Sequence, residues 1–136
     1  MTKNTNTTHN SVNKTAAGFT IIAGFYGFSG VLVGAITGHG ERLAELYLQV
    51  SQMYFFFHTA SLLAIAALLP KEAKNNPKAL VFAGACFAIG APAFSISLFL
   101  NAVLSSSISM LMPLGGTLML LGWFCVTVYA IGKIFK

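Results

Sequence analysis

The chain has 136 residues, of which 56% are hydrophobic and only 8% are charged, and its formal net charge is +5. Soluble domains are typically about 45–50% apolar and about 25% charged. The composition therefore excludes an ordinary soluble globular protein, which would lack the polar surface to cover itself, and the length allows a single domain.

Charged residues are absent from three long stretches, which cover residues 15–40, 46–70 and 79–132. A helix needs roughly 20 apolar residues to cross a bilayer, so the first two stretches each hold one span and the third holds two. The sequence therefore predicts an all-α integral membrane four-helix bundle. We expect its helices at about 16–37, 47–69, 78–102 and 113–133, within a transmembrane domain over 16–136.

The ends of these helices follow from local signals. Residues 1–15, rich in Thr and Asn, predict a disordered polar tail. The linker from Gly38 to about Tyr47 is expected to be helical and to merge into the second helix, which Pro70 ends. Pro92 predicts a kink in the third helix, and Pro113 suits the first turn of the fourth.

Basic residues are distributed unequally between the two sides of the predicted bundle. One side carries seven of them, namely Lys3, Lys14, Lys71, Lys74, Lys78, Lys133 and Lys136, whereas the other carries only Arg42. The positive-inside rule therefore predicts that both termini are cytoplasmic. These lysines would attract anionic lipid, so the positive charge requires no nucleic acid as a partner.

A row of polar residues at helical spacing marks the second span as the candidate site. Its members are Tyr47, Ser51, Tyr54, His58 and Ser61, at steps of four and three residues, so they share one helical face. His58 lies about 15 Å from the outer end of the span, near the midplane. The candidate polar intramembrane site is Ser51, Tyr54, His58 and Ser61. His58 is interpreted as a neutral, hydrogen-bonded residue, with a proton relay or ligand contact, or a metal or haem ligand, as alternatives.

Small residues predict how the helices pack. Gly27, Gly30 and Gly34 belong to a stripe on one face of the first helix, and the fourth helix contains Gly115, Gly116 and Gly122. In lipid, helices associate by close packing, which small residues permit. We therefore expect helix–helix seams here, with a ligand groove along the glycines of the first helix as the alternative. Periodicity leaves the oligomeric state open.

Three further polar residues follow Pro92: Ser95, Ser97 and Asn101 are expected to act as polar partners for backbone groups freed by the proline. Gly38-His39-Gly40 is expected to form a turn at the outer face. His39 and His58 are predicted to lie too far apart to share a metal ion, and neither has a Cys or carboxylate at ligand spacing. No metal site and no cofactor is predicted.

Several short segments resemble the YgdD-like family of small four-span membrane proteins of unknown function. The matching segments are Gly34-Ala35-Ile36-Thr37-Gly38-His39-Gly40, Tyr54 with His58, Phe94-Ser95-Ile96-Ser97-Leu98-Phe99, Met112-Pro113-Leu114-Gly115-Gly116 and Gly122-Trp123. Phe55, Ile96 and Phe99 depart from the family's usual Gln, Gly and Tyr. The resemblance implies a bacterial inner-membrane location, with relatives in mitochondria, and it implies no activity.

Three function classes are compatible with these features. The first is a structural or assembly module that binds other membrane proteins or lipid, and it requires only the small-residue seams. The second is a small carrier or proton-coupled transporter that uses the polar face around His58. The third is a haem- or quinone-binding or enzymatic protein. No catalytic constellation is found, because Glu41, Glu45 and Glu72 all lie in predicted loops.

Overall fold

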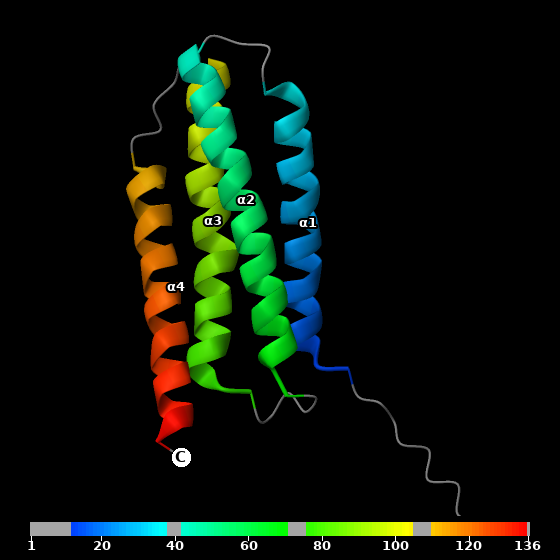
Figure 1. The fold of residues 1–136 in the computed structure, drawn as a ribbon, viewed down its shortest axis with the longest axis vertical. Coiled ribbons are helices and arrows are strands. Elements are labelled where there is room, and N and C mark those ends of the chain that lie inside the picture. Colours follow the sequence, from blue (N-terminus) through cyan, green and yellow to red (C-terminus); the bar gives the residue numbers. More distant parts are fainter. Residues whose placement is uncertain (1–11, 38–41, 71–75, 105–109, 136) are drawn as a thin grey trace, which may run out of the picture.

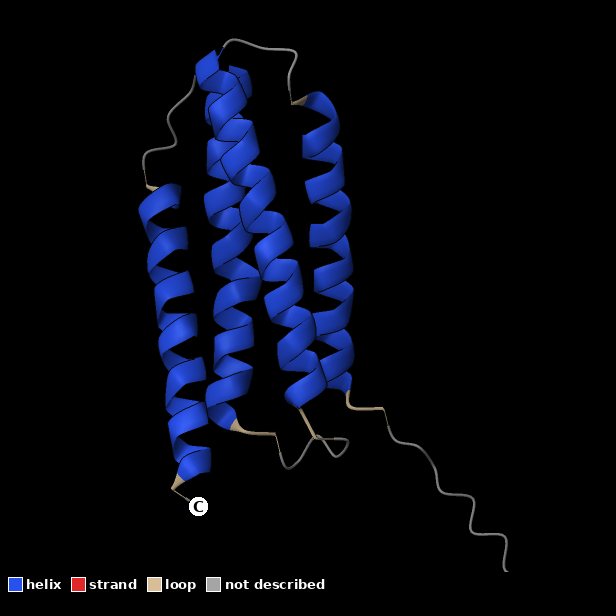
Figure 2. Ribbon diagram, in the orientation of Figure 1, coloured by secondary structure: helices blue, strands red, loops and turns tan. Residues whose placement is uncertain are grey.

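The computed structural model describes residues 12–37, 42–70, 76–104 and 110–135, without the side chains of Arg42 and Leu43. Four α-helices account for nearly all of them: α1 (Lys14–Ile36), α2 (Arg42–Leu68), α3 (Lys78–Leu104) and α4 (Leu111–Ile134). Figure 2 shows no strand in the described part of the chain. The all-α prediction is confirmed. The expected tail over 1–11 and the expected turn at Gly38, His39 and Gly40 lie outside the described residues.

The helices are slightly longer than the sequence predicts, for local reasons. α1 begins at Lys14 because the side chain of Asn13 accepts hydrogen bonds from the backbone N–H groups of Thr15 and Ala16. α2 already begins at Arg42, so the charged segment before Tyr47 is part of the helix from there on. α4 begins at Leu111. Pro113 then falls in the first turn, where a missing N–H leaves no helical hydrogen bond unmade.

The four helices form an open bundle rather than a closed one. α2 and α3 run side by side in the middle, with α1 on one side of this pair and α4 on the other (Figure 1). The buried core lies mainly among α1, α2 and α3, where its largest members are Phe19, Tyr26, Phe55, Leu62, Leu80 and Phe87. From α4, Met119 joins this core. The outward faces of α1 and α4 are therefore left to the surroundings.

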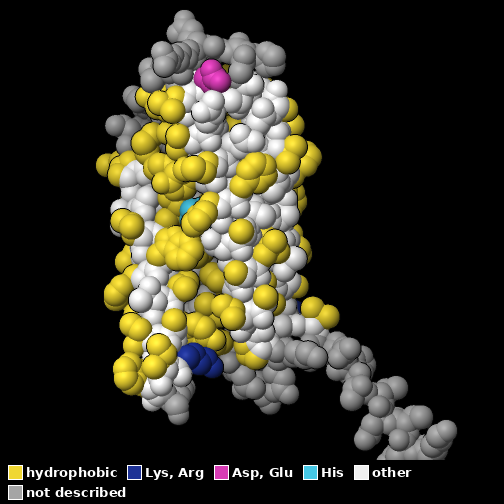
Figure 3. Space-filling view, in the orientation of Figure 1, with side chains coloured by type: hydrophobic (Ala, Val, Ile, Leu, Met, Phe, Trp, Pro, Cys, Tyr) yellow, Lys and Arg dark blue, Asp and Glu magenta, His cyan; other side chains and the backbone are white. Residues whose placement is uncertain are grey.

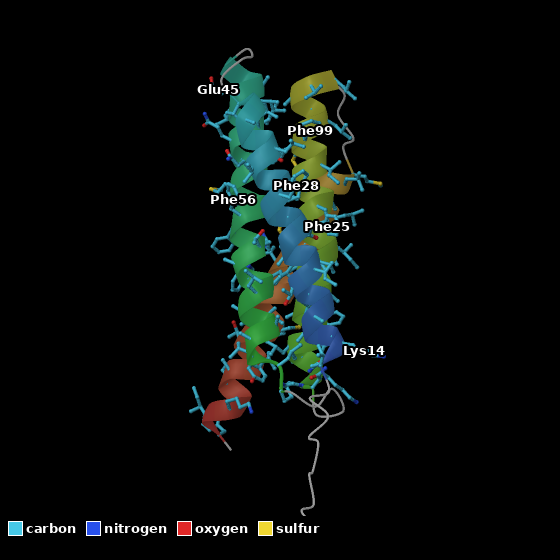
Figure 4. The ribbon with its side chains drawn as sticks, turned by 90° about the vertical axis from the view of Figure 1, so that its right-hand side faces the viewer. Lys14, Phe25, Phe28, Glu45, Phe56 and Phe99 are labelled. Carbon is cyan, nitrogen blue, oxygen red and sulfur yellow. The ribbon has the colours of Figure 1, made fainter. Side chains whose placement is uncertain are left out.

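The exposed surface of these helices is largely apolar. Each described helix has 23 to 27 residues, which corresponds to roughly 35–40 Å at 1.5 Å per residue and exceeds the hydrocarbon thickness of a bilayer. All four are long and apolar enough to cross a membrane. Hydrophobic side chains cover much of the visible surface in Figure 3, and Lys14 and Glu45 lie at opposite ends of the bundle (Figure 4). α1 begins and α4 finishes at the lysine end (Figure 1).

Glycines produce the close contact between α3 and α4. A Cβ added at Gly115 would lie 2.6 Å from the backbone nitrogen of Phe94 and 2.7 Å from the carbonyl oxygen of Gly90. A Cβ at Gly122 would lie 2.6 Å from the ring of Phe87. The two helices can therefore approach this closely only because these positions have no side chain. Gly90 also belongs to this seam, although its packing role is not predicted from the sequence.

Gly116 does not pack between helices, in contrast to the prediction from the sequence. A Cβ at this position would have no atom of another described helix within 4 Å. Successive residues of a helix point about 100° apart, so Gly115 and Gly116 cannot both face α3, and it is Gly115 that does. Three glycines of α1 do face α2, with Gly27 beside Thr59, Gly30 beside Phe56 and Gly34 beside Gln52.

Asn13 ties three chain segments together at the lysine end of the bundle. Besides capping α1, its side-chain amide donates to the carbonyl oxygen of Pro70, at 2.6 Å, and to Oδ1 of Asn76, at 2.7 Å. Pro70 follows α2 and Asn76 precedes α3, and Asn13 itself is buried. From the sequence, Asn13 is predicted to belong to the polar tail. Its position directly before the first apolar stretch is nevertheless typical of a helix cap.

Candidate functional site

The polar face of α2 is split between two environments. Ser51 and His58 are completely buried, and the hydroxyl of Ser51 donates to the carbonyl oxygen of Ser95 in α3 at 2.9 Å. Ser61 is partly exposed, and its hydroxyl donates to the carbonyl oxygen of Phe57 in its own helix. Ser51 and His58 therefore lie within the bundle, whereas Ser61 makes its hydrogen bond locally.

His58 uses only one of its two ring nitrogens. Nδ1 lies 2.9 Å from the carbonyl oxygen of Tyr54, one turn earlier in α2. A carbonyl oxygen only accepts hydrogen bonds, so Nδ1 carries the proton and Nε2 of the neutral ring presents a lone pair. Nε2 is buried and has no hydrogen-bond partner among the described residues. The neutral, hydrogen-bonded histidine expected from the sequence accounts for Nδ1 and leaves Nε2 unexplained.

Aromatic rings surround this histidine. The ring of Phe87 in α3 lies edge-on to it at 5.2 Å between centroids, that of Phe57 lies edge-on at 5.5 Å, and that of Tyr54 is stacked at 5.9 Å. Trp123 of α4 contacts both Phe57 and Phe87, at 5.7 and 5.0 Å. We call His58, Tyr54, Phe57, Phe87 and Trp123 the aromatic box. It is the one place where α2, α3 and α4 meet through ring contacts among the described residues.

Of the polar residues after Pro92, Asn101 and Ser95 do not bond to the carbonyl that the proline frees. Asn101 donates to the carbonyl oxygen of Ser97, four residues earlier. Ser95 contributes its carbonyl oxygen to Ser51, while its own hydroxyl is buried and without a hydrogen-bond partner among the described residues. Ser97 is fully buried as well. Within the described chain, no three His, Cys, Asp or Glu side chains come together in a way that could hold a metal ion.

The carbonyl freed by Pro92 is satisfied from another helix. Proline has no N–H, so the carbonyl oxygen of Ala88, four residues earlier, lacks its usual helical partner. The hydroxyl of Tyr26 in α1 donates to this oxygen at 2.5 Å. The ring of Tyr26 also packs edge-on against Phe55 of α2. One buried tyrosine thus joins α1 to α2 and α3, and the departure at Phe55 from the family pattern lies in this contact.

Tyr26→Phe is expected to lower the free energy of unfolding by about 1 kcal/mol, because the carbonyl of Ala88 then has no donor. In a Pro92→Ala background the same change is expected to cost much less, since residue 92 regains an N–H that can bond to Ala88. A double-mutant cycle on unfolding in detergent measures this coupling. An equal cost of Tyr26→Phe in both backgrounds would contradict the assignment.

Every described helix of this chain is long enough to cross a bilayer, and the buried hydroxyls of Tyr26 and Ser51 donate to backbone carbonyls of α3, so the chain is a multi-pass helical membrane protein. A family described as "Protein of unknown function (DUF423)" matches residues 33–116. A UPF0382 membrane protein of Haemophilus influenzae is 33% identical over 103 residues, which cover 71% of this chain and 80% of that protein. The chain belongs to the DUF423 family. No solved structure matches it.

The family match covers only part of the features described above. It includes the last residues of α1, all of α2 and α3 and the start of α4 up to residue 116, and therefore His58, Ser51, Ser95 and Gly115. Asn13, Tyr26 and Trp123 lie outside it.

Proposed function

We propose that this protein is a non-enzymatic assembly module of the membrane, which holds another transmembrane helix against the outward face of α1. The observation that carries the proposal is the shape of that face. Ile21, Gly24, Phe25 and Phe28 line a shallow apolar groove, and a Cβ at Gly24 would have no atom within 4 Å. An apolar side chain of a neighbouring helix can enter such a notch, as small residues permit in lipid.

The side chains around the notch support a protein partner of this kind. Ile21, Phe25 and Phe28 are each more than 60% exposed, and their spacing of four and three residues keeps them on one side of α1. Figure 4 shows Phe25 and Phe28 on the face of α1 that is turned away from the rest of the bundle. Large side chains flanking a glycine give a surface with both knobs and a hole, which suits interdigitation with a helix.

The transporter alternative has less to support it. All three side-chain carboxylates of the chain lie outside the long apolar stretches. Among the described residues, His58 contacts aromatic rings and one backbone carbonyl. A proton relay needs further titratable groups in line with the histidine. The haem- or quinone-binding alternative depends on Nε2 of His58, which is buried within the bundle.

The proposal includes the placement of the bundle in the membrane. Lys14, Lys78 and Lys133 lie at one end, where Lys133 also approaches the ring of Tyr129 at 5.6 Å. This end would face the cytoplasm and contact anionic lipid headgroups. The order of the motifs favours a location in a bacterial inner membrane. It also favours membership of the YgdD-like group, which has mitochondrial relatives.

Photo-crosslinking from the α1 groove tests the proposed function. With benzoylphenylalanine in place of Phe25, irradiation of intact membranes is expected to give a defined protein adduct, which Gly24→Leu abolishes because leucine fills the notch. The matched control is the same photoprobe at Phe124, an equally exposed phenylalanine on α4, where lipid adducts alone are expected. Lipid adducts alone from both positions would refute the proposal, and a self-adduct would identify the partner as a second copy.

A further inference from the structure

Nε2 of His58 is an acceptor without a donor among the described residues, in the middle of the membrane region. His58 is only 1% exposed, and its Nδ1–H is already committed to Tyr54. A buried acceptor that lacks a hydrogen bond is unfavourable, and hydrocarbon offers no water to supply one. The hydroxyl of Ser95 is the other buried polar group without a partner in the described segments, but it lies nearer the level of Ser51, about two turns or roughly 10 Å away along α2. It cannot serve as the donor.

Two rings of the aromatic box reach the outer surface of the bundle. Phe87, behind the histidine, is completely buried, whereas Phe57 and Trp123 are 55% and 40% exposed on the outer surface. Phe57 and Trp123 come from different helices, α2 and α4, so a side-chain rotation of either one would uncover the ring from the membrane side.

We propose that the aromatic box binds a membrane-soluble phenol or hydroquinone, which enters sideways between α2 and α4 and donates its hydroxyl to Nε2 of His58. The protonated Nδ1 makes Nε2 an acceptor, so the ligand must supply a donor. The walls are aromatic rings, which favour another ring at offset or edge-on geometry. An oxidised quinone has only acceptor oxygens and is rejected by this site. The inference concerns a different face from the α1 groove and is independent of the proposed function.

The chain carries its own reporter for this site. Trp123 is the only tryptophan, and it contacts both Phe57 and Phe87, which in turn contact His58. Bromine atoms quench tryptophan fluorescence at short range. A dibromophenol with both bromines meta to the hydroxyl can therefore be compared with dibromoanisole, its methyl ether, on the protein in detergent micelles. The two probes differ in the hydroxyl donor and in little else.

Dibromophenol is expected to quench Trp123 saturably with an affinity about fivefold higher than that of dibromoanisole, which corresponds to one net hydrogen bond. His58→Phe keeps an aromatic ring but removes the acceptor, so both probes are then expected to quench equally and weakly. Equal quenching by the two probes in the unaltered protein overturns the proposal, whether or not His58→Phe folds. So does a preference for the phenol that survives in folded His58→Phe.

Two neighbouring phenylalanines test the route of entry. Phe57→Ala removes part of the cover and is expected to speed the onset of quenching by dibromophenol in stopped-flow measurements. Phe56→Ala is the matched control, because Phe56 lies against Gly30 of α1, away from the box, and its onset rate is expected to equal that of the unaltered protein. Equal acceleration by both changes, or by neither, overturns entry between α2 and α4.

Discussion

Gly115→Ala is expected to destabilise the bundle by about 1–3 kcal/mol, the usual cost of overpacking a close contact. The new methyl group would lie within 3 Å of two backbone atoms of α3, at Gly90 and Phe94. Backbone atoms in a helix cannot rotate away as a flexible side chain can, so α3 and α4 would have to separate. Separation would weaken the contacts along the whole seam, including the one between Gly122 and Phe87.

Gly116→Ala is the matched control for this prediction. A methyl group there would meet nothing within 4 Å, and alanine favours a helix over glycine by up to about 1 kcal/mol. The two neighbouring substitutions are therefore expected to change stability in opposite directions. Unfolding by SDS in mixed micelles, followed by the fluorescence of Trp123, measures both. A loss of similar size at both positions would show that the contact between α3 and α4 is not as described.

Asn13→Ala is expected to lower the free energy of unfolding by about 2 kcal/mol, because one side chain has two roles. Its Oδ1 caps the first turn of α1, and its Nδ2 joins the end of α2, at Pro70, to the start of α3, at Asn76. Alanine removes all of these hydrogen bonds. The carbonyl oxygen of Pro70 would then lose the donor that holds it beside α1.

Asn13→Asp separates the two roles. A carboxylate still accepts from the N–H groups of the first turn and interacts favourably with the positive end of the helix dipole, but it cannot donate to Pro70. The free energy of unfolding of Asn13→Asp is therefore expected to be about 1 kcal/mol lower than that of the unaltered protein, a smaller loss than that of Asn13→Ala. Thermal unfolding followed by circular dichroism measures this difference. If Asp were as stable as Asn, the cap alone would account for the effect and the link to Pro70 would contribute nothing.

The site shows where inference from the sequence stops. The 3.6-residue period places Ser51, His58 and Ser61 on one face of α2, and this placement holds within the helix itself. How far a neighbouring helix covers that face depends on the crossing of α2 with α3, so Ser51 and His58 are buried while Ser61 is partly exposed. Likewise, Pro92 predicts a freed carbonyl near Ala88, but its donor, Tyr26, is 62 positions away.

By itself, the sequence determined the number of spans, their approximate limits and the all-α class. The physical reason is that hydrocarbon admits no unsatisfied backbone, so a charge-free stretch of this length has to be a helix. Tertiary structure alone decided which of two adjacent glycines faces α3 and which hydroxyl reaches the carbonyl of Ala88. It also decided that aromatic rings surround His58, whose Nε2 has no donor within the described part of the chain. These outcomes depend on the rotation and crossing of whole helices, which a periodic pattern within one helix does not contain.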